Sequence, residues 1–523
     1  MTSTAQNAGP NEAYERFKWT QTSAGLWERA IDECEGFYAY FCRDPTDPGK
    51  AGFPVTGCAS FELQQDGEDD IGARIKDAFN RAWASLGLEC PALGSWIEFD
   101  NDSEAWRKVC KPLDSAGVRD EWATSTFHLV HSSTSEEWFN SHPPTYRTPH
   151  LFLLQHTNID EEATGAGQIW RATVALRSPH DTVDGVGVVQ LLSRLLELAA
   201  GHFLHDAEDR PAGCHPKNLD QLLPLPMRVA TGISPVPNAR TKERWQAIQA
   251  ANMASATAKP RLGLAITGNG DLPGSFQGAS TVISKTAAAS LTAKCKELGI
   301  TVTHALSAAI VIALRDLHQS STKKDTGDAT SIMRYTNNIL VNLRQAMQSN
   351  SLAHSVGNYH MIAAQSMAVD VPLATTPIAA AERFVSVALQ FRDYYQSVRP
   401  SAASPNSRGL LEYAPMTWEA YTPKASPSAA ASGASSIPAI ADIAVSSLGN
   451  LSSLVKAEHG PLKVSRIWVA GVGLGAGVPM FLGGWDGEIE IGCVFDKAFH
   501  TTSSIVEFLD KTVSSLANAM ASA

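Results

Sequence analysis

Residues 169–198 read IWRATVALRSPHDTVDGVGVVQLLSRLLEL, and this stretch decides the fold. Its first part alternates apolar side chains with polar or small ones, which predicts a β-strand. Its last part carries Val and Leu at positions 188, 191, 192, 195 and 198, the spacing of one face of an α-helix. His180 lies between these two parts and is followed by a turn that contains Asp184 and Gly185. A strand, a turn and a helix in this order would hold a histidine base in a cleft.

The composition describes an ordinary soluble protein with ample core material, since 44% of the 523 residues are hydrophobic and 18% are charged. A chain of this length predicts two or more domains. The formal net charge of -11 argues against a nucleic acid or an anionic membrane as the main partner. An acidic protein can still bind a phosphorylated co-substrate through a local basic patch.

The cysteines and histidines outside the motif predict no metal site and no disulfide framework. The eight cysteines are widely scattered and none forms C-x-x-C, which favours reduced thiols. The spacing of His202, His205, Cys214 and His215 matches no recognisable metal site. The N-terminus has neither a basic start nor an apolar core, so no signal peptide is predicted and we expect a cytoplasmic protein.

The run 467–485, IWVAGVGLGAGVPMFLGGW, is uncharged and long enough to cross a bilayer. Six glycines and Pro479 interrupt it, and charged segments with strand patterns bracket it. We therefore predict strands here rather than a transmembrane helix. The glycines fit neither G-x-G-x-x-G nor a Walker loop, which argues against nucleotide binding.

Strand and helix patterns alternate through residues 1–202, so we predict an α/β N-terminal half that carries the histidine motif. Before the motif strand, the predicted strands of this half are 19–22, 37–41, 96–99, 127–131 and 151–155, and its predicted helix is 71–86.

Residues 203–279 are rich in proline, which interrupts the periodic runs apart from a helical pattern at 242–253, and we interpret this segment as a crossover. Residues 280–523 form the predicted C-terminal half. This half contains a low-complexity loop at 426–438 and ends in a hairpin, whose turn is Asp486-Gly487, and a helix.

The pattern His180-x-x-x-Asp184-Gly185 resembles the active-site motif of the CoA-dependent acyltransferase superfamily. This group includes chloramphenicol acetyltransferase, the plant BAHD acyltransferases, fungal trichothecene O-acetyltransferases and peptide-synthetase condensation domains. The resemblance implies an α/β fold of two chloramphenicol-acetyltransferase-like domains. Each would be a mixed sheet flanked by helices, with the active-site tunnel between them.

Segments of the second half are similar to the same superfamily. CKELGITVTHALSAAIVIALRD, residues 295–316, resembles its helix pair beside the tunnel, and we interpret His304 as a helix-cap or core histidine. NNILVNLR, residues 337–344, resembles a strand that ends in arginine. In that family the motif aspartate turns away from the substrate and pairs with this arginine, so the resemblance implies that Arg344 pairs with Asp184.

Three further residues are candidate oxyanion or substrate contacts. Asn358 belongs to a Gly-Asn pair that resembles the family's, and His360 just beyond it is interpreted as structural. The strand DIAVSSLGN, residues 442–450, resembles the family's Ser-Ser-x-Gly strand, which makes Ser447 or its neighbour Ser446 a candidate oxyanion donor. Trp485 or a backbone N–H is an alternative donor.

The chain departs from two branches of the superfamily. The D-F-G-W-G motif of plant BAHD enzymes is absent, and Gly-Gly-Trp-Asp-Gly at 483–487 is no substitute for it. This absence favours a fungal-type enzyme such as the trichothecene 15-O-acetyltransferase group. Condensation domains usually carry two adjacent histidines at the motif, whereas Pro179 precedes His180 here, which favours the acyltransferase.

The chemistry that the motif implies is general-base catalysis. A neutral imidazole such as that of His180 can take the proton of an alcohol as the alcohol attacks a thioester carbonyl. Asp184 and Gly185 would fix the loop, and we expect Gly185 to supply a backbone conformation that other residues resist. A Ser-His-Asp hydrolase is disfavoured because the chain has no G-x-S-x-G elbow.

We therefore expect an acyltransferase that moves an acetyl or other short acyl group from acyl-CoA to a hydroxyl of a secondary metabolite such as a terpenoid. Acyl-CoA would be a co-substrate rather than a permanently bound cofactor, and the small-molecule alcohol the acceptor, with no nucleic-acid or membrane partner. We expect a monomer. The alternatives are a condensation-type catalyst with carrier-protein-bound acyl donors, and a non-catalytic binding protein, which would have no need of the base.

Overall fold

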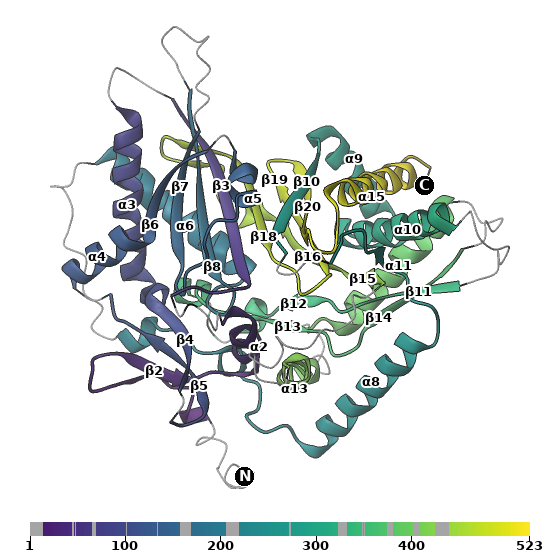
Figure 1. Ribbon diagram of the computed structural model, residues 1–523, viewed down its shortest axis with the longest axis horizontal. Helices are drawn as coiled ribbons and strands as arrows, with labels where there is room; N and C mark the ends of the chain where they lie inside the picture. Colours follow the sequence, from purple (N-terminus) through teal and green to yellow (C-terminus); the bar gives the residue numbers. More distant parts are fainter. Residues whose placement is uncertain are drawn as a thin grey trace.

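The computed structural model describes residues 14–43, 47, 49–64, 70–100, 102–113, 115–132, 134–156, 169–205, 219–270, 274–322, 332–347, 349, 351–373, 380–400, 408–423 and 439–522. They form two α/β halves that lie side by side, the first drawn mainly in purple and blue and the second mainly in teal, green and yellow (Figure 1). Each half is built on a sheet flanked by helices, as predicted.

The first half is built on a six-stranded mixed sheet in the order β17-β18-β3-β8-β7-β6. The strand of the motif, β8 (Ile169–Pro179), lies near its middle and pairs with β3 along its whole length. The motif helix α6 packs together with α3 against this sheet. Four residues of its predicted apolar stripe are buried (Val188, Leu191, Leu192 and Leu195), and Leu198 is partly buried against the same core. The other strands and α3 have the bounds β3 (Pro54–Gln64), β6 (Phe127–Ser132), β7 (His150–His156), β17 (Glu458–His459), β18 (Leu462–Gly471) and α3 (Ile71–Glu89); α6 is Gly185–Leu204.

A four-stranded sheet, β1-β2-β5-β4, lies beside the first sheet. The predicted strand 37–41 is wrong, because these residues belong to helix α2 (Glu33–Cys42). Asp32 and Glu35 form a capping box that starts this helix, and this signal outweighs the strand propensity of the aromatic run. The remaining elements of the half are β1 (Thr20–Gln21), β2 (Trp27–Ala30), η1 (Pro91–Gly94), β4 (Ser95–Asp100), β5 (Ala105–Cys110), α4 (Ala116–Thr126) and α5 (Ser135–Asn140).

The second half is built on a four-stranded sheet in the order β10-β20-β19-β16, and helices α9, α10 and α15 lie against it (Figure 1). The predicted hairpin is confirmed: β19 and β20 are antiparallel, and Asp486 and Gly487 at the turn have φ of 46° and 82°. The bounds are β10 (Phe276–Ile283), α9 (Lys285–Glu297), α10 (Val302–Thr322), α11 (Ala380–Val398), β16 (Ile443–Asn450), η6 (Leu451–Ser453), β19 (Val478–Trp485), β20 (Glu488–Asp496) and α15 (Thr502–Ser522).

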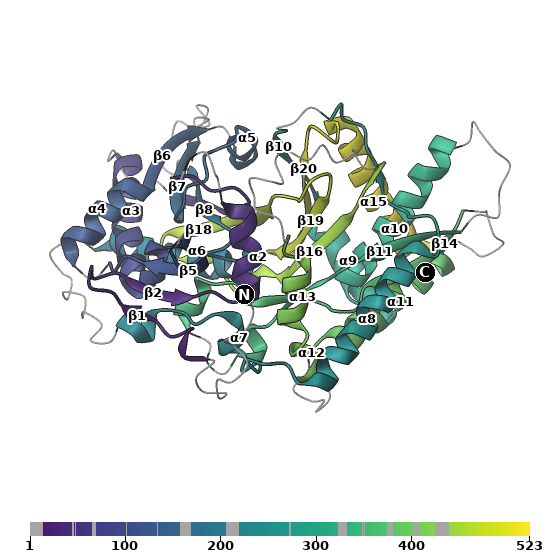
Figure 2. The same ribbon diagram turned by 60° about the horizontal axis from the view of Figure 1, so that its bottom comes forward.

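Strand β18 joins the two halves. It comes from the predicted C-terminal half but pairs with β3 from Lys463↔Glu62 to Gly471↔Val55, so it completes the first sheet. In Figure 2 its yellow-green ribbon lies among the blue elements. The uncharged run 467–485 is therefore divided between β18 and β19 in two different sheets. The predicted boundaries at 202 and 280 stay a prediction.

Short elements connect the sheets. The predicted crossover contains a helix, α8, that covers 242–253 and runs along the lower edge of the second half (Figure 1). Strand β12 ends at Asn342, so Arg344 begins a 3-10 turn rather than ending the strand as predicted. The loop predicted at 426–438 lies outside the described residues. The bounds are η3 (Leu219–Leu222), α7 (Met227–Ala230), α8 (Ala239–Thr257), β9 (Leu264–Ala265), β11 (Ile332–Asn337), β12 (Leu340–Asn342), η4 (Arg344–Ala346), η5 (Leu352–Ser355), β13 (His360–Ile362), β14 (Met367–Pro372), α12 (Arg408–Leu411), α13 (Ala414–Tyr421) and β15 (Ile440–Ala441).

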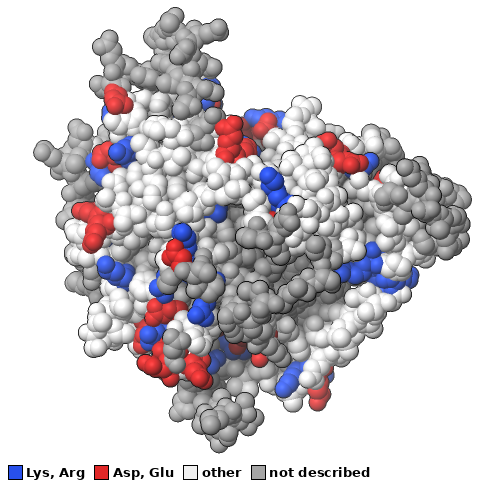
Figure 3. Space-filling view, viewed as in Figure 1, with Lys and Arg blue, Asp and Glu red and all other residues white. Residues whose placement is uncertain are grey.

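One helix among the described residues, α6, is apolar and long enough to cross a membrane by composition alone. Of its most apolar 18-residue window, 56% is buried inside the protein, where the helix packs against the first sheet. On the face shown in Figure 3, positive and negative side chains lie interspersed.

Candidate active site

His180 directly follows β8, at the end of the strand, where its backbone N–H donates to the carbonyl oxygen of Phe53 at 3.2 Å. The imidazole stacks on the ring of Tyr38, with centroids 4.2 Å apart and planes 6° apart. Phe53 lies on another side, with its ring 5.8 Å away. Phe53 has a φ of 45°, a conformation that costs energy for a bulky residue, so local strain lies next to the histidine.

The surroundings of His180 keep its imidazole neutral. Burial and the nearby His360 ring lower the pKa of His180 to about 4, and Asn358 and Asp184 offset only part of this shift. The Nδ1 atom is buried and has no hydrogen-bond partner among the described residues. At neutral pH the ring is therefore a proton acceptor rather than a cation.

Asp184 caps the motif helix. Its Oδ1 accepts the backbone N–H of Gly187 at 2.8 Å, and its Oδ2 accepts the backbone N–H of Tyr359 at 2.9 Å and a proton of Arg344 Nη1 at 2.8 Å. Burial alone would raise the pKa of Asp184, but the Arg344 ion pair and the other hydrogen bonds hold it well below its usual range. The carboxylate is thus an ionised structural anchor.

Arg344 and Asn358 bring the second half onto the motif loop. Arg344 forms the predicted buried ion pair with Asp184 and also donates to the carbonyl oxygen of His354 at 3.3 Å. Asn358 donates from Nδ2 to the carbonyl oxygen of His180 at 2.8 Å. Both residues therefore contact the motif through their side chains, Arg344 at the carboxylate of Asp184 and Asn358 at the backbone carbonyl of His180.

The expectation for Gly185 is wrong. Its φ is not positive, and a Cβ atom there would meet Leu448 and Val469 at ordinary distances of 3.5 and 3.6 Å. The tight position is Gly187, where a Cβ atom would lie 2.1 Å from the carbonyl oxygen of Ser355 in η5. A side chain at this position in the first turn of α6 would prevent η5 from coming so close.

Ser447 and Trp485 do not contact His180 by a hydrogen bond or a ring contact in the part of the chain that the structure describes. Ser447 is exposed, and its hydroxyl lies 2.9 Å from that of Thr303 at the start of α10. Trp485 is 6% exposed within the core that includes the motif helix, and its Nε1 is buried with no partner among the described residues. His304 caps α10 as interpreted, since its Nδ1 accepts the backbone N–H of Thr301 at 3.1 Å.

Helix α2 supplies side chains that the sequence analysis missed. The hydroxyl of Tyr38 lies 2.7 Å from Nε2 of His360, whose Nδ1 lies 3.6 Å from Oδ2 of Asp184. His360, interpreted from the sequence as structural, thus lies between the motif aspartate and the ring on which His180 stacks. The capping box that begins at Asp32 was the available sequence signal for this helix.

A buried charged cluster supports the motif loop from the same helix. Glu35 on α2 accepts two hydrogen bonds from Arg29, both at 2.7 Å, and lies 3.3 Å from Nζ of Lys108. Lys108 also donates to the carbonyl oxygen of Asp181 at 3.3 Å. Burial would raise the pKa of Glu35, but the two cations lower it to about 2. The residue after His180 is therefore fixed by a charge network in the interior.

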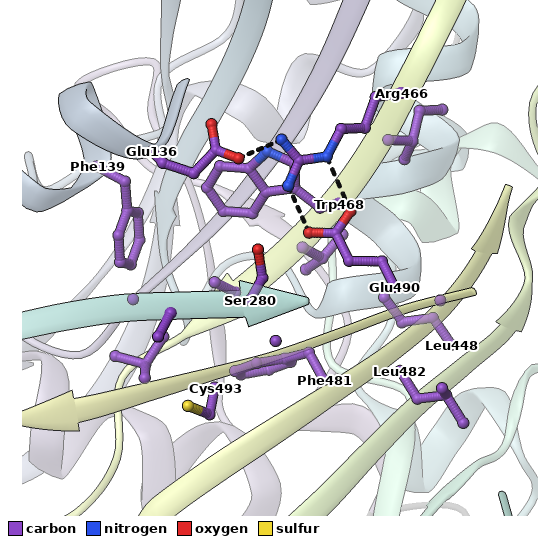
Figure 4. A pocket seen from close by; sticks show the side chains of 18 of the residues that line it. Glu136, Phe139, Ser280, Leu448, Arg466, Trp468, Phe481, Leu482, Glu490 and Cys493 are labelled. Carbon is purple, nitrogen blue, oxygen red and sulfur yellow. Dashed lines mark hydrogen bonds and ion pairs between the residues drawn. The ribbon is translucent and has the colours of Figure 1, made fainter. Parts of the chain in front are cut away.

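A largely apolar cavity, partly open to solvent, lies between the two sheets. In Figure 4, Arg466 of β18 lies between Glu136 and Glu490 at one side, and it forms ion pairs with both. His180 does not line this cavity, but Leu448 and Val469 do, and they are the side chains next to Gly185. The cavity thus reaches the motif turn through one side chain from each sheet.

Among the described residues no group of three or more His, Cys, Asp or Glu side chains is arranged to hold a metal ion. Of the four residues whose spacing matches no recognisable metal site, His202, His205, Cys214 and His215, the last two lie outside the described residues.

Comparison with protein-family models finds no match, and neither does comparison with the sequences of curated proteins. Solved structures do match. TRI3 trichothecene 15-O-acetyltransferase from Fusarium sporotrichioides superposes with a TM-score of 0.76 over 98% of this chain and 99% of its own, at 14% identity. The first condensation domain of the calcium-dependent antibiotic synthetase gives 0.60 over 94% and 96%, at 12% identity.

SgcC5 protein from Streptomyces globisporus gives a TM-score of 0.53 over 94% of this chain and 98% of its own, at 13% identity. These neighbours agree with the resemblance indicated by the His180 motif. The chain therefore has the two-domain, chloramphenicol-acetyltransferase-like α/β fold that the trichothecene acetyltransferase shares with condensation domains.

Proposed function

We propose that the chain is an O-acyltransferase that moves an acetyl or other short acyl group from acyl-CoA to a hydroxyl of a secondary metabolite such as a terpenoid. The observation that carries this proposal is the neutral His180 imidazole at the end of β8, with Nδ1 buried. Burial of Nδ1 leaves Nε2 as the nitrogen that meets the acceptor. The likeness in fold to an acetyltransferase supports the same function.

In this proposal the acceptor hydroxyl attacks the thioester carbonyl while His180 takes its proton. The tetrahedral intermediate then collapses, the C–S bond breaks and the leaving thiolate recovers the proton from His180. Asp184 holds the loop rather than moving a proton, because its oxygens are already engaged by Arg344 and two backbone N–H groups. Ser447 and Trp485 stay candidate contacts to the oxyanion or substrate. The base contributes roughly 10²–10⁴-fold of the rate.

A condensation-type catalyst with carrier-protein-bound acyl donors is the second candidate, because condensation domains share the fold. Pro179, in the position where those domains usually carry a further histidine, favours the acyltransferase. We further propose a cytoplasmic monomer with acyl-CoA as co-substrate, no permanently bound cofactor or metal, and neither nucleic acid nor membrane as partner.

The test is release of free thiol from acetyl-CoA by the purified protein with a panel of hydroxylated terpenoids and polyketides. We expect acceptor-dependent release that falls at least 10²-fold in His180→Ala. His131→Ala is the matched control, because His131 is exposed on β6. Equal activity of wild type and His180→Ala would refute the mechanism. Transfer only from acyl groups on carrier proteins would establish the second candidate.

A further inference from the structure

We propose that Tyr38 and His360 are positioning residues that fix the His180 ring, through a stack of Tyr38 on the imidazole and a hydrogen bond from Tyr38 to His360 beside Asp184. The inference rests on the proposed role of His180 as the base. It extends the site to two residues outside the motif, one from α2 and one from β13.

The first step is the stack itself. The Tyr38 ring is nearly parallel to the imidazole and 4.2 Å from it, so it covers one face of His180. A histidine side chain turns about two bonds, and the tilt of its ring is loosely held unless neighbours restrict it. Here the imidazole cannot tilt toward α2 without meeting the phenol ring. The stack therefore selects one ring plane for the base.

The second step is the fixation of Tyr38. The residue is 4% exposed, and the ring of Trp418 in α13 packs against the Tyr38 ring with centroids 5.6 Å apart. Its hydroxyl lies 2.7 Å from His360 Nε2. His360 in turn contacts Trp418 edge-on at 5.5 Å. Both the ring and the hydroxyl of Tyr38 are thus held by elements of the second half of the chain.

The third step is the direction of the hydrogen bond. The Asp184 carboxylate lies 3.6 Å from Nδ1 of His360, which favours the tautomer that carries its proton on Nδ1. In that tautomer Nε2 is an acceptor, so the Tyr38 hydroxyl donates to it. Asp184 therefore fixes the motif twice: directly, as the cap of α6, and indirectly, through His360 and the ring that His180 stacks on.

If Tyr38 and His360 only position the base, mutating them should lower the rate of the chemical step without weakening the binding of substrate. Misplacement of a catalytic group by about 1 Å can cost 10²-fold in rate even when substrates still bind. We expect Tyr38→Leu, which removes the stack, to lower kcat roughly 10- to 100-fold with little change in KM. Tyr38→Phe keeps the ring and loses only the hydroxyl, so its kcat should lie between those of Tyr38→Leu and wild type. His360→Gln should lie closer to wild type than His360→Phe, because glutamine retains a polar partner for Tyr38.

A second readout does not depend on acyl transfer. The rate at which diethylpyrocarbonate modifies His180 is followed by mass spectrometry of its peptide. The Tyr38 ring shields one face, so Tyr38→Leu should raise this rate several-fold, while Tyr38→Phe leaves it near the wild-type value. Tyr395→Leu is the control, because Tyr395 packs against another histidine, His304, with ring centroids 5.2 Å apart. It should leave the His180 rate unchanged.

The outcomes separate the positioning role of Tyr38 and His360 from the proposed acyltransferase function. Wild-type modification rates and wild-type kcat in both Tyr38→Phe and Tyr38→Leu would overturn the positioning role. Absence of acyl transfer by the wild type would count against the proposed function, while the His180 modification rate would still decide the stack. Circular dichroism shows whether Tyr38→Leu folds. If it does not, the kcat values of Tyr38→Phe, His360→Gln and His360→Phe test the proposal instead. Equal kcat in these three variants and wild type would refute the positioning role.

Discussion

Asp184 is the residue on which the backbone of the site most depends. It caps α6, accepts the N–H of Tyr359 and forms a buried ion pair with Arg344, and both partners of that pair have side chains about 5% exposed. Asp184 joins the motif turn to Arg344, 160 positions away, so it stabilises the fold and holds the site in shape at the same time.

Asp184→Asn should lower the free energy of unfolding by about 3–5 kcal/mol, because it leaves the Arg344 cation buried without its counter-charge. Urea denaturation measures this change. Asp370→Asn is the control, since Asp370 pairs with Arg334 at the surface with its side chain 38% exposed, and such pairs contribute about 0–1 kcal/mol. A loss in Asp184→Asn no larger than that in Asp370→Asn would contradict the anchoring role.

The lowered pKa of His180 predicts an acid limb of kcat/KM near pH 4 rather than near the ordinary histidine value of about 6.5. Only the neutral imidazole accepts a proton, and burial keeps it neutral until the pH falls well below 6. The same shift lowers stability as the pH falls from about 6.5 toward 4, because the unfolded chain binds the proton first. Rates from pH 3.5 to 8, with circular dichroism at each pH to show that the protein stays folded, test this prediction, and a limb at pH 6.5 would refute it.

At the scale of elements, the site depends on helix starts. Helix α6 begins at the motif with Asp184 as its cap, and α2 begins at the capping box of Asp32 and Glu35 and carries Tyr38 toward His180. The third element is η5, whose Ser355 carbonyl lies against the first turn of α6. Two helices and a 3-10 turn, from distant parts of the chain, thus meet at the motif.

Gly187→Ala should destabilise the protein by about 1–3 kcal/mol, because the new methyl group would overlap the Ser355 carbonyl and force η5 away from α6. Gly117→Ala in the first turn of α4 is the matched control. A Cβ atom there meets nothing within 4 Å, so the change should stabilise by up to about 1 kcal/mol. Thermal unfolding compares the two variants. Equal melting temperatures would show that η5 moves aside at no cost.

At the scale of the whole molecule, β18 and Arg466 join the two halves. The strand completes the first sheet, and the Arg466 guanidinium binds Glu490 of the second sheet and Glu136 of α5. The cavity lies between these layers, so its shape depends on how the halves are held together.

Gly492→Val should obstruct that cavity while β20 keeps its place. A Cβ atom at Gly492 would lie 3.7 Å from its nearest neighbour, which is ordinary contact, and its side chain would point into the cavity. If the acceptor or acyl group uses this space, its KM should rise roughly tenfold or more. Gly484→Val is the matched control, because a Cβ atom there also has 3.7 Å of room but Gly484 does not line the cavity. Identical kinetics in both variants would show that the substrates lie elsewhere.

The sequence by itself determined the strand β8, the turn and the helix α6, and also the β19–β20 hairpin, because periodicity and turn chemistry are local properties. Only the tertiary structure decided which side chains surround His180. Tyr38 and His360 lie 322 positions apart, and no spacing rule connects them. Strand β18 crosses to the first sheet because pairing with β3 covers an edge there, a choice that depends on the assembled sheet rather than on the strand's own sequence. The contact of Ser447 with Thr303 also depends on the assembled structure. The Ser447 hydroxyl meets Thr303 of α10 only because the second half packs that helix against β16.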